Sequence, residues 1–313
     1  MKKSLSILMA IMLLAILPAS AKVTHLLPKP HQITQQSGAF ALNRQVTITY
    51  NGTESCELLE EVFTTNGCTI GNSGAQVTVT IVNEIAGAYD YELEGFENEA
   101  YTLNVTADAI NITAVTPTGV IRAAQTLAQL AEGYDKGSEA IEAVQITDWA
   151  SFKLRGYMHD VGRSFISTAE LKKHIELLSR FKVNCFHWHF TENQAWRLQI
   201  EEYPALTSAE SMTRFAGSFY TQEECRQVAA LAKKHGVVII PEIDMPGHSE
   251  AFHRAMGFDM QTDEGVAVLK DVLNEVAALF PDAPYIHIGA DEREITYTDA
   301  NGKGFLADRK SVV

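Results

Sequence analysis

From about Trp149 onward, the chain repeats one order of segments: an apolar stretch, a burst of polar side chains and an amphipathic helix. The four apolar stretches are residues 153–160, 183–190, 237–243 and 285–289. Strands that alternate with helices in this way build a parallel sheet, either open and doubly wound or closed into a (β/α) barrel. The third stretch (VVIIPEI) is nearly continuous in apolar character, as expected for a strand covered on both faces.

Capping boxes mark two of the helix starts. In a capping box, a Ser or Thr and a Glu three residues later satisfy each other's backbone amides. Residues 167–170 (STAE) and 221–224 (TQEE) have this form, and they predict helices that run to about residues 180 and 235. A third helix is predicted over residues 264–280.

The polar bursts decide between the two architectures. They begin at Asp160, His187, Glu242 and His287, where each apolar stretch ends or is about to end. In a barrel the carboxyl ends of all strands meet on one face, and active sites are built there. No G-x-G-x-x-G fingerprint follows the first stretch, so a nucleotide-binding doubly wound sheet lacks its main support. The sequence therefore predicts a (β/α)8 TIM barrel.

The length of this region limits how much of a barrel it can form. Residues 149–313 supply four strand–helix units, whereas a closed barrel needs eight and typically about 250 residues. The segment after Glu292 offers no fifth apolar strand. We expect a partial barrel holding about the first half of the fold, in a chain that is a fragment of a longer catalytic domain and whose activity in this form is open.

Residues 22–148 have a different order of segments. Short β-branched, alternating stretches predict strands over residues 45–50, 76–82, 100–105 and 109–114, and residues 118–131 have helical spacing of their apolar side chains. We expect a small α+β accessory domain with an antiparallel sheet. No catalytic constellation is visible in it.

The first 21 residues have the order of a signal peptide. Lys2 and Lys3 precede an apolar run, Ile7–Leu17, and Ala19-Ser-Ala21 supplies small residues for cleavage. The run is shorter than the roughly 20 residues that span a bilayer, and no later segment is apolar enough to do so. We expect a protein that is exported, either periplasmic or secreted.

The charge balance restricts the partners. With 25 Lys and Arg against 39 Asp and Glu, the formal net charge is -14, and the acidic excess is spread along the chain. Nucleic acids and anionic membranes bind clustered basic residues, so neither is expected as a partner. A neutral ligand such as a sugar is not excluded.

The chain has four cysteines and no C-x-x-C motif, which argues against a Cys-based zinc or redox site. Cys56 and Cys68 are close in sequence and could pair in an exported protein. Buried free thiols are an equal alternative.

Asp291-Glu292 follows the last apolar stretch (YIHIG). Burial and a neighbouring carboxylate both raise the pKa of a carboxyl group, so a pair at a strand end suits general acid catalysis. A solvated turn is the alternative for such a dipeptide.

Two further candidates follow earlier strands. Arg163 could clamp hydroxyls or a carboxylate, or it could form a structural ion pair. His248, past the Pro246-Gly247 turn, could orient a catalytic carboxylate or be a hydrogen-bonded core histidine. Glu242 and Asp244 point the same way along their strand by alternation.

His187 and His189 raise a competing hypothesis. An H-x-H pair on a strand places both imidazoles on one face, which is metal-ligand geometry. A metal-dependent hydrolase could complete the set with His248, His287 and Asp291. The pair lies in mid-strand, before the polar residues Thr191–Asn193, which favours catalysis without a metal.

Taken together, four ordered motifs resemble glycoside hydrolase family 20, the β-N-acetylhexosaminidases. The matching strings are RGYMHDVGR (155–163), HWHFTENQAWR (187–197), PEIDMPGH (241–248) and HIGADE (287–292). The upstream strings LLPKPHQI and AYTLNV, and the region of the 118–131 helix, look like the accessory domain of this family.

The resemblance implies hydrolysis of terminal N-acetylhexosamine by substrate assistance, in which the 2-acetamido oxygen of the sugar is the nucleophile. By the same match, Glu292 is the general acid and then the general base, and Asp291 orients the acetamido group. Arg163 binds ring hydroxyls, and Glu192 and His248 form a relay behind the acid, with Asp244 in support. No metal or organic cofactor is implied. The implied partners are glycans ending in N-acetylglucosamine or N-acetylgalactosamine, or chitooligosaccharides.

The sequence departs from the family pattern at several positions. Ala290 stands where Gly usually precedes Asp-Glu, Glu192-Asn193 replaces Asp-Asp, Ser164 replaces His, and Ala195 replaces Gly. The C-terminal half of the family's barrel, which carries the tryptophans of the sugar pocket, has no counterpart. A non-catalytic carbohydrate-binding remnant is therefore a further alternative.

Overall fold

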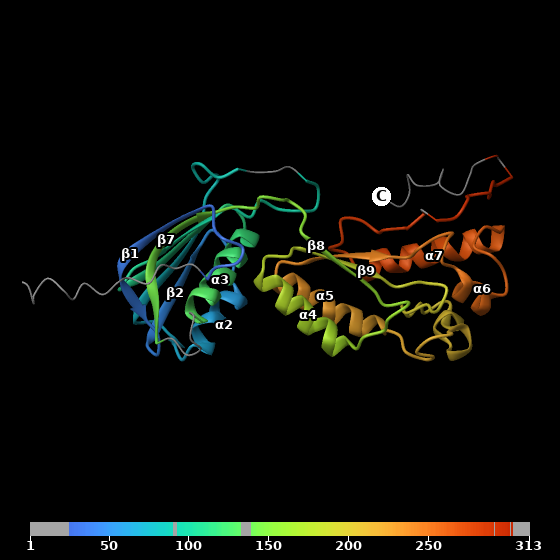
Figure 1. The fold of residues 1–313 in the computed structure, drawn as a ribbon, viewed down its shortest axis with the longest axis horizontal. Helices are drawn as coiled ribbons and strands as arrows, with labels where there is room; N and C mark the ends of the chain where they lie inside the picture. The colour runs from blue at the N-terminus through green and yellow to red at the C-terminus, as the bar shows by residue number, and fades with distance from the viewer. Residues whose placement is uncertain (1–24, 90–92, 133–138, 291, 301, 303–313) are drawn as a thin grey trace, which may run out of the picture.

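The protein folds into two parts that follow each other along the chain (Figure 1). The computed structural model describes residues 25–89, 93–132, 139–290, 292–300 and 302. The expected signal peptide, residues 1–21, lies outside the described residues. One part is a seven-stranded sheet with two helices on it, and the other is a small parallel sheet with longer helices.

The first part is built on a mixed sheet of strand order β1-β7-β5-β6-β4-β2-β3. Its strands are β1 (Gln32–Ala41), β2 (Gln45–Asn51), β3 (Thr69–Ile70), β4 (Ala75–Ile81), β5 (Tyr101–Val105), β6 (Ala109–Ala114) and β7 (Ala140–Asp148).

The prediction of an antiparallel sheet is wrong for half of this sheet. The pairs β2–β3, β2–β4 and β4–β6 are parallel, and the pairs among β1, β7, β5 and β6 are antiparallel. Helix α2 (Glu57–Thr65) carries the chain back across the sheet between β2 and β3, and such a crossover is what makes two neighbouring strands parallel. Alternation of side chains along a strand is the same in both directions, so it could not reveal this.

Helix α3 (Pro117–Glu132) packs beside α2 on one face of the sheet (Figure 1). Its apolar side chains, among them Val120 and Leu127, meet inward-facing residues of β5 and β6 such as Leu103 and Ile112. Ten residues of α3 are buried, which is why its apolar spacing was visible in the sequence.

The second part contains a three-stranded parallel sheet of order β10-β9-β8. Its strands are β8 (Gly156–Asp160), β9 (Cys185–His189) and β10 (Val238–Glu242). Its helices are α4 (Thr168–Arg180), α5 (Gln222–Lys234), α6 (Glu250–Met256) and α7 (Asp263–Leu279), with two 3-10 turns at Pro204–Thr207 and Ala209–Ser211. The repeated strand–helix order and the parallel pairing are those of a partial (β/α) barrel.

The expected fourth strand is reduced to a single bridge. Of residues 285–289, only His287 pairs with the sheet: its amide donates to the carbonyl of Pro241 on β10, and its carbonyl accepts from the amide of Ile243, just beyond β10. Gly289 and Ala290 then adopt left-handed backbone conformations, with φ of 63° and 69°, so the chain turns away from the sheet immediately afterwards. This turn ends the strand early, and the apolar composition of residues 285–289 did not predict it.

Both predicted capping boxes are present. Ser167 caps α4 and Thr221 caps α5, and in each the Glu side chain reaches back to the capping amide. Between the sheet and the helices lies one apolar cluster that includes Phe186, Trp188 and Val272, all buried. The alternate residues of β9, His187 and His189, face the other side of the sheet, so that side is polar.

Buried charges join the two parts. Arg122 of α3 lies 2.8 Å from Glu99 and donates to the carbonyl of Gly236, and Arg155 donates to Glu99 from the other side. Burial raises the pKa of Glu99, but the two guanidinium groups more than compensate and lower it. Because a buried carboxylate without such partners would be strongly destabilising, this network fixes the contact between the two parts.

All four cysteines are free thiols, so Cys56 and Cys68 are not paired. Among the described residues, no helix combines the length and the apolar character that a bilayer crossing requires.

Candidate active site

The candidate residues lie where the strands of the second part end. Arg163 follows β8, Glu192 follows β9, His248 follows β10, and Glu292 follows the bridge at His287. Because parallel strands all point their carboxyl ends the same way, four segments that are far apart in sequence deliver these side chains to one edge of the sheet.

His248 lies between two carboxylates. Its Nε2 is 2.7 Å from Glu292 Oε2, and its Nδ1 is 2.9 Å from Glu192 Oε1. His248 Nδ1 also lies 3.4 Å from an Arg163 guanidinium nitrogen, within hydrogen-bond distance. The three side chains therefore lie in contact in one row, with His248 between an accessible carboxyl group and a buried one. Glu292 is 68% exposed and Glu192 is 1% exposed.

Arg163 is held by two acids. Its guanidinium lies 3.0 Å from Asp160 Oδ2 and also contacts Glu192. Half of the Arg163 side chain remains exposed, so it can offer donors to a ligand at the strand ends. Of the two alternatives that the sequence left open, the structure thus contains the ion pair, and the role of Arg163 in ligand binding stays a prediction.

Asp244 is buried two residues beyond the end of β10. Burial and the nearby Glu242 carboxylate raise its pKa. Gly289 approaches it so closely that a β-carbon at position 289 would lie 1.9 Å from Asp244 Oδ1. Only glycine fits there, and this contact sets how the segment leading to Glu292 crosses the sheet end.

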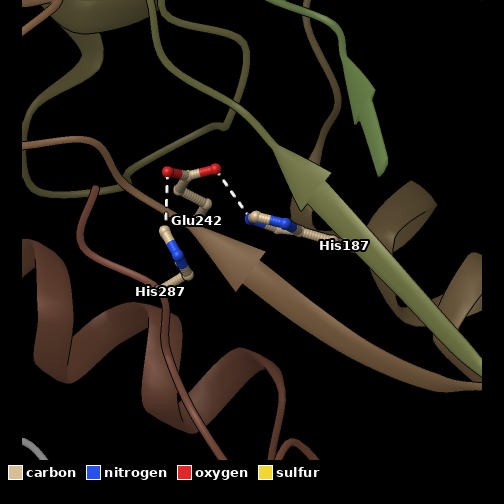
Figure 2. Close-up of side chains that lie close together, drawn as sticks. All are labelled: His187, Glu242 and His287. Carbon is tan, nitrogen blue, oxygen red and sulfur yellow. Dashed lines mark hydrogen bonds and ion pairs between the residues drawn. The ribbon is translucent and has the colours of Figure 1, made fainter. Parts of the chain in front are cut away.

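A cluster of three histidines surrounds Glu242 on the polar face of the sheet. His189 Nδ1 and His187 Nε2 lie 2.5 and 2.7 Å from Glu242 Oε2, and His287 Nδ1 lies 2.8 Å from Oε1. Figure 2 shows His187 and His287 approaching different oxygens of this carboxylate from two sides. Burial would raise the pKa of Glu242, but the histidines hold it well below its usual range. The pKa of His287 is raised in turn by its hydrogen bond to Glu242.

The sequence prediction of a shared histidine face is confirmed, since His187 and His189 both reach Glu242. The set proposed around them is wrong in one member, because His248 contacts Glu192 and Glu292 instead. Sequence reasoning did not single out Glu242 as the centre of the cluster. The signal was present, since Glu242 ends one strand beside the H-x-H of the next.

Asp291, predicted as the residue that orients the substrate, lies outside the described residues. The other predicted residues, Glu292, Arg163, His248, Glu192 and Asp244, lie at the same sheet edge. At this edge Arg163 keeps part of its guanidinium group exposed, and Glu292 keeps an exposed carboxyl group.

Comparison with known proteins identifies the family. Residues 152–262 match "Glycosyl hydrolase family 20, catalytic domain", and residues 23–149 match "Glycosyl hydrolase family 20, domain 2". Glu292 and His287 lie beyond the matched catalytic region.

Two curated relatives are called beta-hexosaminidase. The protein of Porphyromonas gingivalis is 31% identical over 316 residues, which cover 88% of this chain and 40% of the relative. That of Vibrio furnissii is 32% identical over 317 residues, covering 88% of this chain and 50% of the relative. The chain thus spans about half the length of the curated relatives it matches.

Solved structures agree. The GH20 exo beta-N-acetylglucosaminidase of Vibrio harveyi, in complex with N-acetylglucosamine, matches with a TM-score of 0.73 and 30% identity, covering 86% of this chain and 47% of that one. The beta-N-acetylhexosaminidase of Bacteroides fragilis matches with a TM-score of 0.72 and 29% identity, covering 85% and 56%. With both of its parts matched in order, and with the strand-end residues brought together, the chain belongs to glycosyl hydrolase family 20.

Proposed function

We propose that this protein acts as a β-N-acetylhexosaminidase, which removes terminal N-acetylhexosamine residues from glycans or chitooligosaccharides with retention of configuration. The observation that carries the proposal is the row of contacts Glu292–His248–Glu192, in which an imidazole lies between an accessible carboxyl group and a buried one. A general acid that must later act as a base has to be held in position, and a contact with an imidazole can do this.

In the first step of the proposed reaction, the carbonyl oxygen of the substrate's 2-acetamido group attacks C1 of the same sugar. The new C1–O bond forms as the glycosidic C1–O bond breaks, and Glu292 gives its proton to the departing oxygen. The nucleophile is part of the substrate, so its effective concentration is high and no enzyme nucleophile is needed.

In the second step, water attacks C1 of the cyclic oxazolinium intermediate. The Glu292 carboxylate takes a proton from that water, the bond to the acetamido oxygen breaks, and the acetamide is restored. Arg163 holds ring hydroxyls through its exposed donors. By resemblance to the family, Asp291 accepts a hydrogen bond from the acetamido N–H and stabilises the positive charge.

The names of similar proteins support the substrate class. The curated relatives are beta-hexosaminidases, and the Vibrio harveyi structure was solved with N-acetylglucosamine bound. Because this chain covers only about half of each of them, the complete activity of those enzymes is a proposal for it.

The test is hydrolysis of 4-methylumbelliferyl N-acetyl-β-glucosaminide compared with the glucosaminide that lacks the acetyl group. We expect the first to be cleaved and the second to be spared, because only the first has the internal nucleophile. Glu292→Gln should lower kcat by about 10²–10⁴-fold. Glu294→Gln, two residues away and exposed, is the matched control and should leave the rate unchanged.

Three outcomes would contradict the proposal. Equal rates on the two substrates would remove substrate assistance, and a normal rate for E292Q would remove Glu292 as the acid. Binding of N-acetylglucosamine with no turnover would instead support a carbohydrate-binding role.

We also propose that the protein is exported, on the strength of the charged, apolar and small-residue segments in residues 1–21. Expression of the full chain in a bacterium, followed by fractionation and N-terminal sequencing, tests this. A mature chain starting near Lys22 outside the cytoplasm is expected. An intact Met1 in the cytoplasm would contradict it.

A further inference from the structure

The cluster around Glu242 is not used by the proposed reaction. His187, Glu242 and His287 come from β9, β10 and the bridge segment, and their ligand atoms all lie within 4.8 Å of one another. Figure 2 shows that the two imidazoles converge on the carboxylate and do not stack on each other. Their ring centroids are 4.6 Å apart with an angle of 47° between the planes.

His187 has a buried ring nitrogen without a hydrogen-bond partner, as His189 also does. Its Nε2 is buried and lies 2.7 Å from Glu242 Oε2, yet it is not aligned for a hydrogen bond with that oxygen or with any other described atom. A buried polar nitrogen without a hydrogen bond costs free energy, and such an atom in a native structure calls for a partner of another kind. A cation between the nitrogen and the carboxylate would supply one.

From these observations we propose that His187, Glu242 and His287 form a zinc site on the polar face of the sheet, in addition to the hydrolytic site. Two neutral imidazoles and one carboxylate are a common ligand set for Zn²⁺. The ligand atoms of a tetrahedral zinc lie about 3.3 Å apart, so the two histidine–carboxylate contacts, at 2.7 and 2.8 Å, would have to open by about half an ångström to admit it.

His189 has a supporting position in this arrangement. Its Nδ1 lies 2.5 Å from Glu242 Oε2, and its other nitrogen is 4.0 Å from Glu192. It therefore orients the Glu242 carboxylate and is not itself a ligand, as is usual for groups that surround a metal-binding carboxylate.

The site has an open side. The His287 side chain is 49% exposed, whereas Glu242 is 5% exposed. Zinc could thus enter past His287, and the fourth position would be left to water. The predicted role is to tie three successive strand ends together, because each ligand comes from a different one.

The test is titration of the tag-free full chain with Zn²⁺ by isothermal calorimetry, after removal of metals by chelation. We expect one equivalent to bind, and His287→Gln to weaken binding by at least tenfold. His287 is half exposed, so this variant should fold. Glu242→Gln should have the same effect, and its folding is checked by circular dichroism. The control is His253→Gln, an exposed histidine of α6, which should bind zinc as the wild type does.

Absence of a zinc equivalent in the wild type would overturn the proposal, and so would an equal loss of affinity in H253Q and H287Q. The experiment does not read activity, so its result is independent of whether the chain hydrolyses N-acetylhexosaminides. Bound Co²⁺ offers a second readout, since its visible spectrum reports the ligand geometry and should change in H287Q.

Discussion

Two residues of the candidate site, His248 and Ala290, have left-handed backbone conformations. His248 has φ of 46° and Ala290 has φ of 69°, a region that side chains with a β-carbon rarely adopt. Such conformations persist where the surrounding contacts impose them, which is typical of functional sites. The family usually has glycine at the position of Ala290. The methyl group of Ala290 is unfavourable mainly because a residue with a β-carbon is strained in this backbone conformation.

Replacing Ala290 by glycine should therefore stabilise the protein. A left-handed conformation costs a non-glycine residue about 1–2 kcal/mol, so A290G should raise Tm by a few degrees in thermal unfolding followed by circular dichroism. Gly289→Ala is the opposing control, because its β-carbon would collide with Asp244 Oδ1. A lower Tm for A290G would mean that the methyl group makes contacts worth more than the strain.

Among the elements, the sequence predicted most of the long helices, because helix caps and apolar spacing are local signals. The capping boxes and apolar spacing located α3, α4, α5 and α7 to within a residue or two. Helix α2 was missed although Leu59, Val62 and Phe63 have helical spacing, because the segment is short and carries no side-chain cap. Strand direction and the loss of the fourth strand depend on crossovers and on backbone turns, which side-chain alternation does not encode.

The capping box of α4 provides a prediction about an element. Ser167→Ala removes the side-chain acceptor for the Glu170 amide and should lower the free energy of unfolding by about 1 kcal/mol, as measured by urea denaturation. Ser164→Ala changes an exposed serine just before the helix and should stay within about 0.5 kcal/mol of the wild type. Equal effects of the two variants would show that the cap does not stabilise α4.

The candidate site was predicted in part from the sequence. The sequence placed Arg163, Glu192, His248 and Glu292 at strand ends, and the parallel sheet brings them together. It could not show that Glu242 gathers three histidines, because that depends on the register of β9 against β10, in which Glu242 lies opposite His189.

For the whole molecule, a second buried ion pair joins the two parts. Lys182 Nζ lies 2.6 Å from Asp148 Oδ2 and also donates to the Tyr101 hydroxyl. Burial raises the pKa of Asp148, but Lys182 and His31 more than offset this and lower it. The folded state therefore binds the Asp148 proton less readily than the unfolded state does.

This shift makes part of the stability dependent on pH. The contribution of Asp148 is fully present above its unfolded pKa of about 3.9 and is lost as pH falls through its lower folded pKa. Asp148→Asn should lower the free energy of unfolding at pH 7 by about 3 kcal/mol, because Lys182 is left buried without its counter-ion. The difference from the wild type should shrink below pH 4 in urea titrations. Asp108→Asn, an exposed control, should show neither effect, and a pH-independent difference in D148N would contradict this account.

The buried junction around Glu99 also decides from which side large molecules can reach the strand ends. Arg155, Asn184 and Gly236, which meet the first part, all precede their strands, whereas the candidate active site follows them. The accessory domain is thus attached at the opposite end of the sheet from the acid. For the proposed function, a glycan would therefore approach Glu292 from the end of the sheet that lies away from this junction.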